Sequence, residues 1–429
     1  MLMHPRSLTP FDPPAAPGDM SAQQPGELAR HAGAAWLAQA LQASRRDTLA
    51  TFAACEAALP GLRVPLRHEL NPPLWELGHI GWFQAFWLGR FMAWRAGYQA
   101  DPDSKRHAAR PPGADALYNS SLVPHDSRWA LPLPDAAATR ARLQQQLDES
   151  LALLASVDDQ APDRNQALYF FRLALLHEDM HHEAALYMAR LLGVPVQDPR
   201  WAARALPAPG APLAFGAGPW RLGSEPGAGF AFDNELCAHP VALPACHIDT
   251  QVLRWAEFLP FVDSGAYDQD ACWSPAGRAW KQRTQAAAPR HLRRSPSGWL
   301  SWQHGQWQPL DEAEAAVHLC LHEAQAWCRW AGRRLPTEAE WERAAIAGGP
   351  LFQWGDVWEW TASPFAPFPG FEAHPYRDYS APWFDGRPVL KGASVLTQPR
   401  MRHPRYRNYF AAERNDVPAG FRTCAVTAA

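Results

Sequence analysis

The chain has 429 residues and a formal net charge of -3 at pH 7. This length exceeds one ordinary domain and suggests two. The chain has no excess of basic residues and no stripe of basic residues interleaved with aromatic ones. We therefore do not expect it to bind nucleic acid. No apolar run is long enough to span a membrane, and the first 25 residues lack the apolar segment of a secretory signal.

The seven cysteines indicate the compartment. Their number is odd, and their spacing shows neither C-x-x-C nor a disulfide pattern. We therefore predict buried thiols in a reducing cytoplasm. The sequence does not define an oligomeric state.

The first half of the chain is rich in Ala and Leu at helical spacing. This periodicity predicts helices over 29–59, 73–97, 135–157 and 167–192. Four helices of this length fit an antiparallel bundle. The connection over 98–134 is long and rich in proline, which is typical of a functional loop or a disordered one.

Two histidines lie one helical turn apart in the last of these helices. His177 and His181 share a face that is otherwise apolar, so both should point into a core. Two neutral imidazoles in such a setting suit a divalent transition metal. The alternative is a pair of core or surface histidines bonded to backbone groups.

A third histidine interrupts a run of large apolar residues around Trp75–Trp87. A single buried histidine such as His79 is more often a hydrogen-bonded core residue than a ligand. Together with His177 and His181, however, His79 would complete a three-histidine site inside the bundle. His182 and Glu183 lie off the shared face, so we predict that His182 is solvated and that Glu183 lies behind the ligands or at the surface.

After the proline-rich segment 205–212 the sequence changes to short stretches rich in Gly, Pro and Trp. This change indicates a second domain. Only 312–331 and 337–347 look helical there. The second of these helices opens with Thr337 and Glu340 at capping-box spacing.

The second half also carries a series of ordered motifs. Each motif alone is commonly architectural. Together they resemble the formylglycine-generating, sulfatase-modifying fold, an irregular C-type-lectin-like domain. The motifs are Phe230-Ala-Phe-Asp-Asn-Glu235, Arg333-Arg-Leu-Pro-Thr-Glu-Ala-Glu-Trp-Glu342, Gly355-Asp-Val-Trp-Glu-Trp-Thr361, Val389-Leu-Lys-Gly-Ala-Ser394 and Gly420-Phe-Arg422.

A metal-binding bundle of the damage-inducible (DinB) type ahead of such a domain resembles the ergothioneine sulfoxide synthase family. The resemblance implies an α+β protein with a flexible tail (1–25), a DinB-like iron-binding four-helix bundle (26–205) and a formylglycine-generating-enzyme-like domain (206–429). It also implies Fe(2+) at His79, His177 and His181. The implied reaction is O2-dependent insertion of a chalcogen at the imidazole C2 of hercynine.

Two departures from the family pattern concern the chalcogen donor. The family's arginine-rich loop retains only Arg128 here, and the position of a family aspartate is Phe410. A doubly anionic peptide thiol would lose its partners at these positions. The resemblance makes the substrate-binding candidates Asn408, Tyr409, Phe410, Arg414 and Arg128.

A third departure concerns the family's active-site tyrosines. The matching stretch has Phe365 and Phe368, which have no hydroxyl to donate a proton. Another residue must donate the proton, or the reaction with this chalcogen donor needs no proton-donating residue. If the alignment shifts by a few residues, Tyr376 or Tyr379 fills the role, so we assign no catalytic residue.

These departures favour a donor with little charge. We therefore predict the branch of the family that joins hercynine to a selenosugar and makes selenoneine. The alternative is an ergothioneine sulfoxide synthase that uses a thiol such as cysteine or gamma-glutamylcysteine. Two other classes stay open. A thiol-dependent metal transferase would accept zinc and need no O2, and a lectin-like sugar-binding module would not need the histidines.

Overall fold

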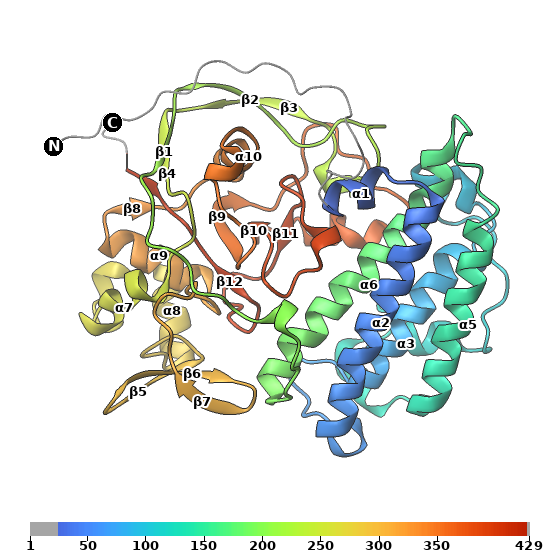
Figure 1. Cartoon of the computed structure of the whole chain (residues 1–429), viewed down its shortest axis with the longest axis horizontal. Helices are drawn as coiled ribbons and strands as arrows, with labels where there is room; N and C mark the ends of the chain where they lie inside the picture. Colours follow the sequence, from blue (N-terminus) through green and yellow to red (C-terminus); the bar gives the residue numbers. More distant parts are fainter. Residues whose placement is uncertain (1–24, 427–429) are drawn as a thin grey trace.

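The computed structural model describes residues 25–426, which form a helical part and a part built around small sheets (Figure 1). This is the predicted α+β architecture. Within the described residues, no helix combines the length and apolar character needed to cross a membrane. Residues 1–24 of the predicted tail lie outside the described range.

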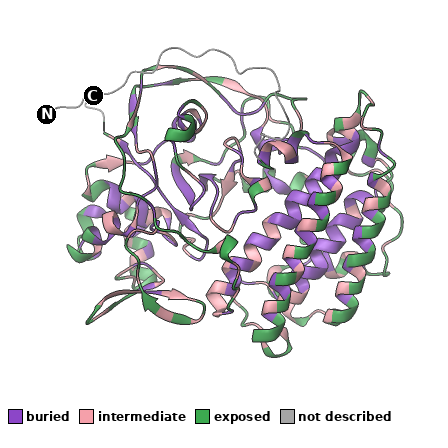
Figure 2. Cartoon of the chain, viewed as in Figure 1, coloured by how far each residue is buried: buried purple, intermediate pink, exposed green. Residues whose placement is uncertain are grey.

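Four long helices form the bundle: α2 (Ala34–Ala58), α3 (Pro73–Gln84), α5 (Ala136–Leu154) and α6 (Arg164–Leu192). Helices α2 and α5 have a buried and an exposed face, whereas α3 and α6 are buried or partly buried along nearly their whole length (Figure 2). The helix predicted over 29–59 is in fact two, because α1 (Pro25–His31) ends before Gly33. The Asp159 carboxylate accepts hydrogen bonds from the Ala34 N–H at 2.9 and 3.0 Å and so caps α2 from a distant segment.

The helix predicted over 73–97 is also interrupted. After α3 the chain makes a π-helical turn, η3 (Ala85–Gly89), and then a 3-10 segment, η4 (Trp94–Gln99). The long connection that follows contains α4 (Ala114–Tyr118) and η5 (His125–Ala130). Tyr118 is buried, so this connection packs against the bundle.

The second part contains two four-stranded sheets and two smaller antiparallel ones. The strand orders are β1-β4-β13-β8, β11-β10-β9-β12, β2-β3 and β5-β6-β7. Only the β12–β9 pairing is parallel among the named strands. The strands are β1 (Leu213–Phe215), β2 (Gly218–Leu222), β3 (His239–Leu243), β4 (Cys246–Ile248), β5 (Leu292–Ser295), β6 (Gly298–Gln303), β7 (Gln306–Pro309), β8 (Arg333–Arg334), β9 (Trp358–Pro364), β10 (Pro388–Gly392), β11 (Asn408–Tyr409), β12 (Ala419–Gly420) and β13 (Cys424–Ala425).

Four helices flank these sheets: α7 (Trp255–Asp263), α8 (Pro275–Thr284), α9 (Leu321–Trp330) and α10 (Glu338–Ala347). The capping box of α10 is present as predicted, with Thr337 Oγ1 accepting from the Glu340 N–H and Glu340 accepting from the Thr337 N–H. The helix predicted over 312–331 is wrong in its first half, because α9 begins only at Leu321. Main-chain pairing of Ala316 with Leu253 draws the preceding residues into an extended path. Helices α7 and α8 were not predicted.

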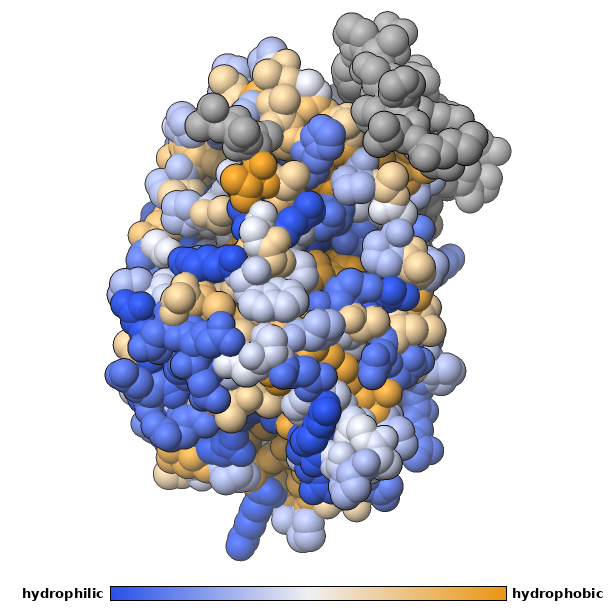
Figure 3. Space-filling view, turned by 90° about the vertical axis from the view of Figure 1, so that its left-hand side faces the viewer, coloured by the Kyte–Doolittle hydropathy of each residue, from blue (hydrophilic) through white to orange (hydrophobic). Residues whose placement is uncertain are grey.

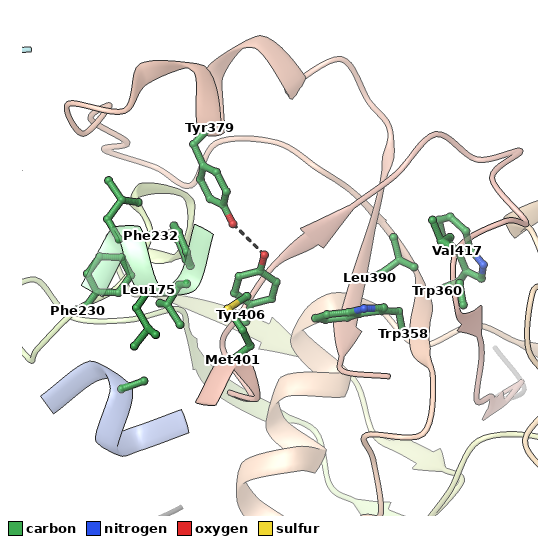
Figure 4. Close-up of a cluster of buried hydrophobic side chains, with 14 of the residues drawn as sticks. Leu175, Phe230, Phe232, Trp358, Trp360, Tyr379, Leu390, Met401, Tyr406 and Val417 are labelled. Atoms are coloured by element: carbon green, nitrogen blue, oxygen red, sulfur yellow. Dashed lines mark hydrogen bonds between the residues drawn. The ribbon is translucent and has the colours of Figure 1, made fainter. Parts of the chain in front are cut away.

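The two parts share one hydrophobic core. Figure 4 shows Phe230, Phe232, Trp358, Met401 and Tyr406 of the second part gathered beside Leu175 of the bundle. Buried ion pairs join the same surfaces: Arg30 to Glu235 and Arg400 to Asp179, both at 2.6 Å. Helix α6 therefore has one face in the bundle and another against the second part.

Candidate metal centre

Three imidazoles meet inside the bundle. His79 comes from α3, and His177 and His181 come from consecutive turns of α6. One ring nitrogen from each lies within 4.8 Å of the others, a spacing at which one ion can contact all three. His79 and His177 are buried, and His181 is partly buried.

The ring orientations of two of these histidines are fixed by hydrogen bonds from Nδ1. Nδ1 of His79 lies 2.7 Å from the backbone carbonyl of Tyr118, and Nδ1 of His181 lies 2.5 Å from a Glu76 carboxylate oxygen. When Nδ1 donates in these bonds, Nε2 carries the free lone pair. Metal-binding histidines are commonly oriented in this way.

His177 supplies the most specific observation. It is buried, its ring stacks on Phe83 with centroids 3.5 Å apart, and neither ring nitrogen has a hydrogen-bond partner. A buried imidazole without partners is costly. A metal ion held jointly with His79 and His181 would satisfy it, so the donor set fits a divalent transition metal.

Burial also keeps the rings of His79 and His177 neutral, as metal ligation requires. Desolvation, reinforced by His181, lowers the pKa of His79 to about 3. Desolvation likewise holds the pKa of His177 well below its ordinary value. At neutral pH both rings carry free lone pairs.

The prediction that His182 is solvated is wrong. Its side chain is buried, and Nε2 lies 2.9 Å from the Thr51 hydroxyl, while Gln398 approaches the other ring nitrogen. Desolvation lowers the pKa of His182 to about 4. Residues of the second part cover this face of α6, which helical spacing alone does not reveal.

Glu183 is also buried and lies at the junction of the two parts. One carboxylate oxygen accepts hydrogen bonds from Trp358 Nε1, Ser394 Oγ and Thr397 Oγ1 at 2.7–2.8 Å. It does not lie at the surface, and none of these hydrogen bonds is to the three histidines. Its role in the structure is to hold α6 against the second part.

A cavity of about 200 Å³ lies between α6 and the second part, and none of the three histidines lines it. Met180, which directly precedes His181, lines it together with Asn408, Tyr409 and Phe410. The structure thus brings three of the predicted substrate-binding residues together in one cavity against α6.

Two tyrosines of the same cavity face one another. The hydroxyls of Tyr379 and Tyr406 are 2.9 Å apart (Figure 4), and the Tyr406 hydroxyl lies 3.4 Å from the Met180 sulfur. Desolvation raises the pKa of both phenols above the ordinary value. Both are therefore neutral hydroxyls at physiological pH.

Each of the two predicted arginines already has a hydrogen-bond partner within the protein. The Arg414 guanidinium forms a two-pronged ion pair with Asp416 at 2.6 Å. Arg128 donates to Asn71 and lies 3.9 Å over the ring of Trp75, which in turn stacks on His79. Neither arginine lines the Asn408 cavity.

The aromatic residues of the third departure also separate in space. Phe365 stacks behind Tyr409, and Phe368 belongs to a core cluster with Leu222 and Leu243. Tyr376 instead packs edge-on against Phe83, with its ring centroid 6.2 Å from that of His177. Of the two phenols considered from the sequence, Tyr376 is the one whose ring lies near His177.

Sequence reasoning missed the groups that orient the ligands. Glu76 precedes His79 by three residues on α3, and this spacing places both on one helix face. That pattern could have indicated a carboxylate partner. The Tyr118 carbonyl could not have been found, because a backbone acceptor leaves no mark in the sequence.

Family models match both parts of the chain and define its class. Residues 40–185 match the DinB superfamily, and residues 208–356 match the sulfatase-modifying factor enzyme 1-like domain. The fold is thus that of a DinB-type bundle joined to a sulfatase-modifying-factor domain.

The relatives name the family more narrowly. The chain is 30% identical to the hercynine oxygenase of Mycolicibacterium smegmatis, over 90% of this chain and 97% of that protein. It is also 30% identical to the hercynine oxygenase of Mycolicibacterium thermoresistibile, over 90% and 94%. A formylglycine-generating enzyme of Streptomyces coelicolor is 33% identical over 32% of this chain and 48% of its own length. The chain belongs to the hercynine oxygenase family.

Proposed function

We propose that this protein is a non-heme iron(II), O2-dependent enzyme that forms a carbon–selenium bond at the imidazole C2 of hercynine, with a selenosugar as donor. The observation that carries the proposal is the buried His177, whose nitrogens have no protein partner, between His79 and His181 in a member of this family. In this proposal the iron-binding bundle spans 26–205 and the second domain 206–429.

His79, His177 and His181 would hold the iron. A ferrous ion held by these histidines would supply the redox chemistry with dioxygen that the reaction needs. The chain itself contributes orientation and exclusion of water. Glu76 and the Tyr118 carbonyl fix two of the rings, and the second part covers the cluster.

The Asn408 cavity would bind hercynine. The Asn408 side-chain oxygen accepts from the Tyr409 N–H, which leaves its amide N–H groups to donate to a substrate carboxylate. The rings of Tyr379, Tyr406 and Tyr409 can present aromatic faces to the trimethylammonium group.

A substitution at Asn408 tests this placement. Asn408→Ala should raise the hercynine dissociation constant of the iron-loaded protein about tenfold, which corresponds to roughly 1.4 kcal/mol. Asn415→Ala, whose side chain contacts Arg290 and does not line the cavity, should leave that constant unchanged. Equal hercynine affinity of wild type and Asn408→Ala, measured by anaerobic titration, would remove Asn408 from the site.

The surroundings of the cavity favour a donor with little charge. Phe410 offers no partner for an ammonium group, and the guanidinium of Arg414 is already paired with Asp416. The Glu183 carboxylate also lines the cavity, but one of its oxygens already accepts three hydrogen bonds. Burying the carboxylates and ammonium of a dipeptide there would cost several kcal/mol, on the order of the penalty for unpaired buried charges. A sugar presents hydroxyls and an apolar ring face, which Phe410 and Tyr409 accommodate at lower cost.

A neutral phenol would supply the proton that Phe365 and Phe368 cannot give. Tyr379 and Tyr406 share a hydrogen bond in the cavity, and burial raises their pKa values. A protonated, hydrogen-bonded phenol beside the reacting atoms is suited to donate.

A panel of donors tests the proposal. Iron-loaded protein with saturating hercynine and O2 should show higher kcat/KM with 1-selenoglucose or 1-thioglucose than with gamma-glutamylcysteine or cysteine. Higher efficiency with either amino-acid thiol would restore the ergothioneine sulfoxide synthase alternative. Thiol transfer by the zinc-loaded protein without O2 would instead favour a thiol-dependent metal transferase.

A further inference from the structure

A second cavity, of about 170 Å³, lies at the far end of α6. It is enclosed by the last turns of α6, the turn between β6 and β7, and the segment 201–204 that follows the bundle (Figure 1). Arg190, which lines it, is nine residues beyond His181, or about 14 Å along the helix axis. None of the three histidines lines this cavity, although Pro418 borders both it and the Asn408 cavity.

Not all nitrogens of the Arg190 guanidinium make hydrogen bonds. One terminal nitrogen donates to the Trp302 carbonyl at 2.9 Å, whereas its Nε is buried without a partner. Desolvation lowers the pKa of Arg190 to about 10, so it remains a cation at neutral pH. A buried cationic donor without a partner costs free energy that an anionic ligand would recover.

A carboxylate lines the same cavity without bonding to this arginine. Glu314 lines the cavity and makes no hydrogen bond to Arg190, so its only effect on Arg190 is electrostatic. Burial raises the pKa of Glu314. The other charged pair of the cavity is different, because Arg204 and Asp356 contact each other at 2.8 Å. Arg190 and Glu314 therefore line this cavity without an ion pair to any other described residue.

His318 adds a third unpaired group to the wall. Its side chain is 2% exposed, and its Nδ1 has no hydrogen-bond partner. An imidazole nitrogen can donate to a carboxylate or accept from an ammonium group, depending on the tautomer. The rest of the wall includes apolar side chains, among them Val194, Val317 and Leu396.

We propose that this cavity is a binding site for a small zwitterionic α-amino acid, whose carboxylate bonds Arg190 and whose ammonium bonds Glu314. A ligand with both charges satisfies the cation and the carboxylate together, and its apolar side chain contacts the valines and Leu396. This site is independent of the proposed iron chemistry, since it holds no metal ligand.

Calorimetric titration of the full-length, iron-loaded protein, without hercynine, tests the proposal. The probes are L-valine, acetate and ethylamine. L-valine should bind saturably and at least tenfold more tightly than acetate or ethylamine. Arg190→Met should weaken L-valine binding at least tenfold, whereas Arg63→Met, at an exposed position, should not. Glu314→Gln, which keeps the side-chain shape, should weaken L-valine binding and should not weaken acetate binding.

The outcomes separate this site from the metal centre. Arg190→Met should keep wild-type hercynine affinity, which also reports that the variant is folded. Absence of saturable L-valine binding to wild type would overturn the proposal. Equal L-valine affinity of wild type and both variants, or acetate binding as tight as L-valine binding, would do so as well.

Discussion

At the scale of single residues, the orientation of His181 is the most informative feature. Its Nδ1 bonds to Glu76, while the Tyr118 carbonyl holds His79 in the same way. His177 lacks such a partner and is instead fixed by stacking on Phe83. Each ring is therefore held in place by a different contact, and each contact can be removed by a separate substitution.

Removing the charge of Glu76 should weaken metal binding. We expect Glu76→Gln to reduce iron affinity by roughly 10- to 100-fold, because a carboxylate partner fixes the ring and raises its basicity. Competition against a chelator of known affinity measures this. Glu178→Gln is the control, since that buried carboxylate pairs with Arg45. An unchanged iron dissociation constant in Glu76→Gln would show that the carboxylate does not support the centre.

Part of this site can be read from the sequence. Helical periodicity places His177 and His181 on one face, and the apolar run around His79 indicates an inward position. The structure brings the three together. The burial of His182 could not be predicted, because the group that covers it, Gln398, lies about two hundred residues further along the chain.

At the scale of elements, a glycine allows α3 and α4 to approach closely. A Cβ built on Gly78 would lie 2.2 Å from a ring carbon of Tyr118, so the two helices must separate if Gly78 is replaced. The backbone carbonyl of Tyr118 is the partner of His79. Because Tyr118 both packs on Gly78 and bonds to His79, separating the two helices would also move the hydrogen-bond partner of His79.

Gly78→Ala should therefore lower iron affinity, by about tenfold if one histidine is misoriented. This loss is expected although alanine favours the helix by about 1 kcal/mol over glycine. Gly89→Ala is a suitable control, because its nearest neighbour is the flexible end of Gln146 at 3.3 Å. The same chelator competition applies, and wild-type iron affinity in Gly78→Ala would contradict the proposed link.

A buried carboxylate at the start of α9 should give the stability a distinct pH dependence. Glu323 accepts hydrogen bonds from Tyr267 and the Cys320 N–H, and desolvation raises its pKa from 4.5 to about 7. The folded state thus binds this proton more tightly than the unfolded state. Its contribution is fully present below about pH 4.5 and is lost as pH rises to about 7, a change on the order of 3 kcal/mol.

Comparison with Glu323→Gln isolates this contribution. Glutamine preserves the capping box but does not titrate. The difference in unfolding free energy between wild type and variant, from urea denaturation, should fall from pH 5 to pH 7 and then stay constant. A difference that is flat over this range would show that Glu323 does not titrate in the predicted window.

The elements themselves were predictable where the pattern is periodic. The bundle helices and α10 follow from apolar spacing and capping. The first half of 312–331 did not form a helix, because its backbone bonds to Leu253 and His318 adopts a left-handed conformation with φ of 62°. Pairing with a distant segment overrode local propensity.

At the scale of the whole molecule, the two parts pack together as one unit. Glu183, His182 and Asp179 of α6 all bond to residues of the second part. The Asn408 cavity exists only where the two parts meet. On the face shown in Figure 3, hydrophilic and hydrophobic residues are intermixed.

Oxygen uptake by the iron-loaded protein tests the central claim most directly. We predict that uptake requires hercynine and a chalcogen donor together, and that one product forms per O2 consumed. His177→Ala should abolish both uptake and iron retention, whereas His182→Gln should retain the iron and the uptake. Uptake that proceeds equally without hercynine, or that survives in His177→Ala, would contradict a hercynine-dependent reaction at the three-histidine centre.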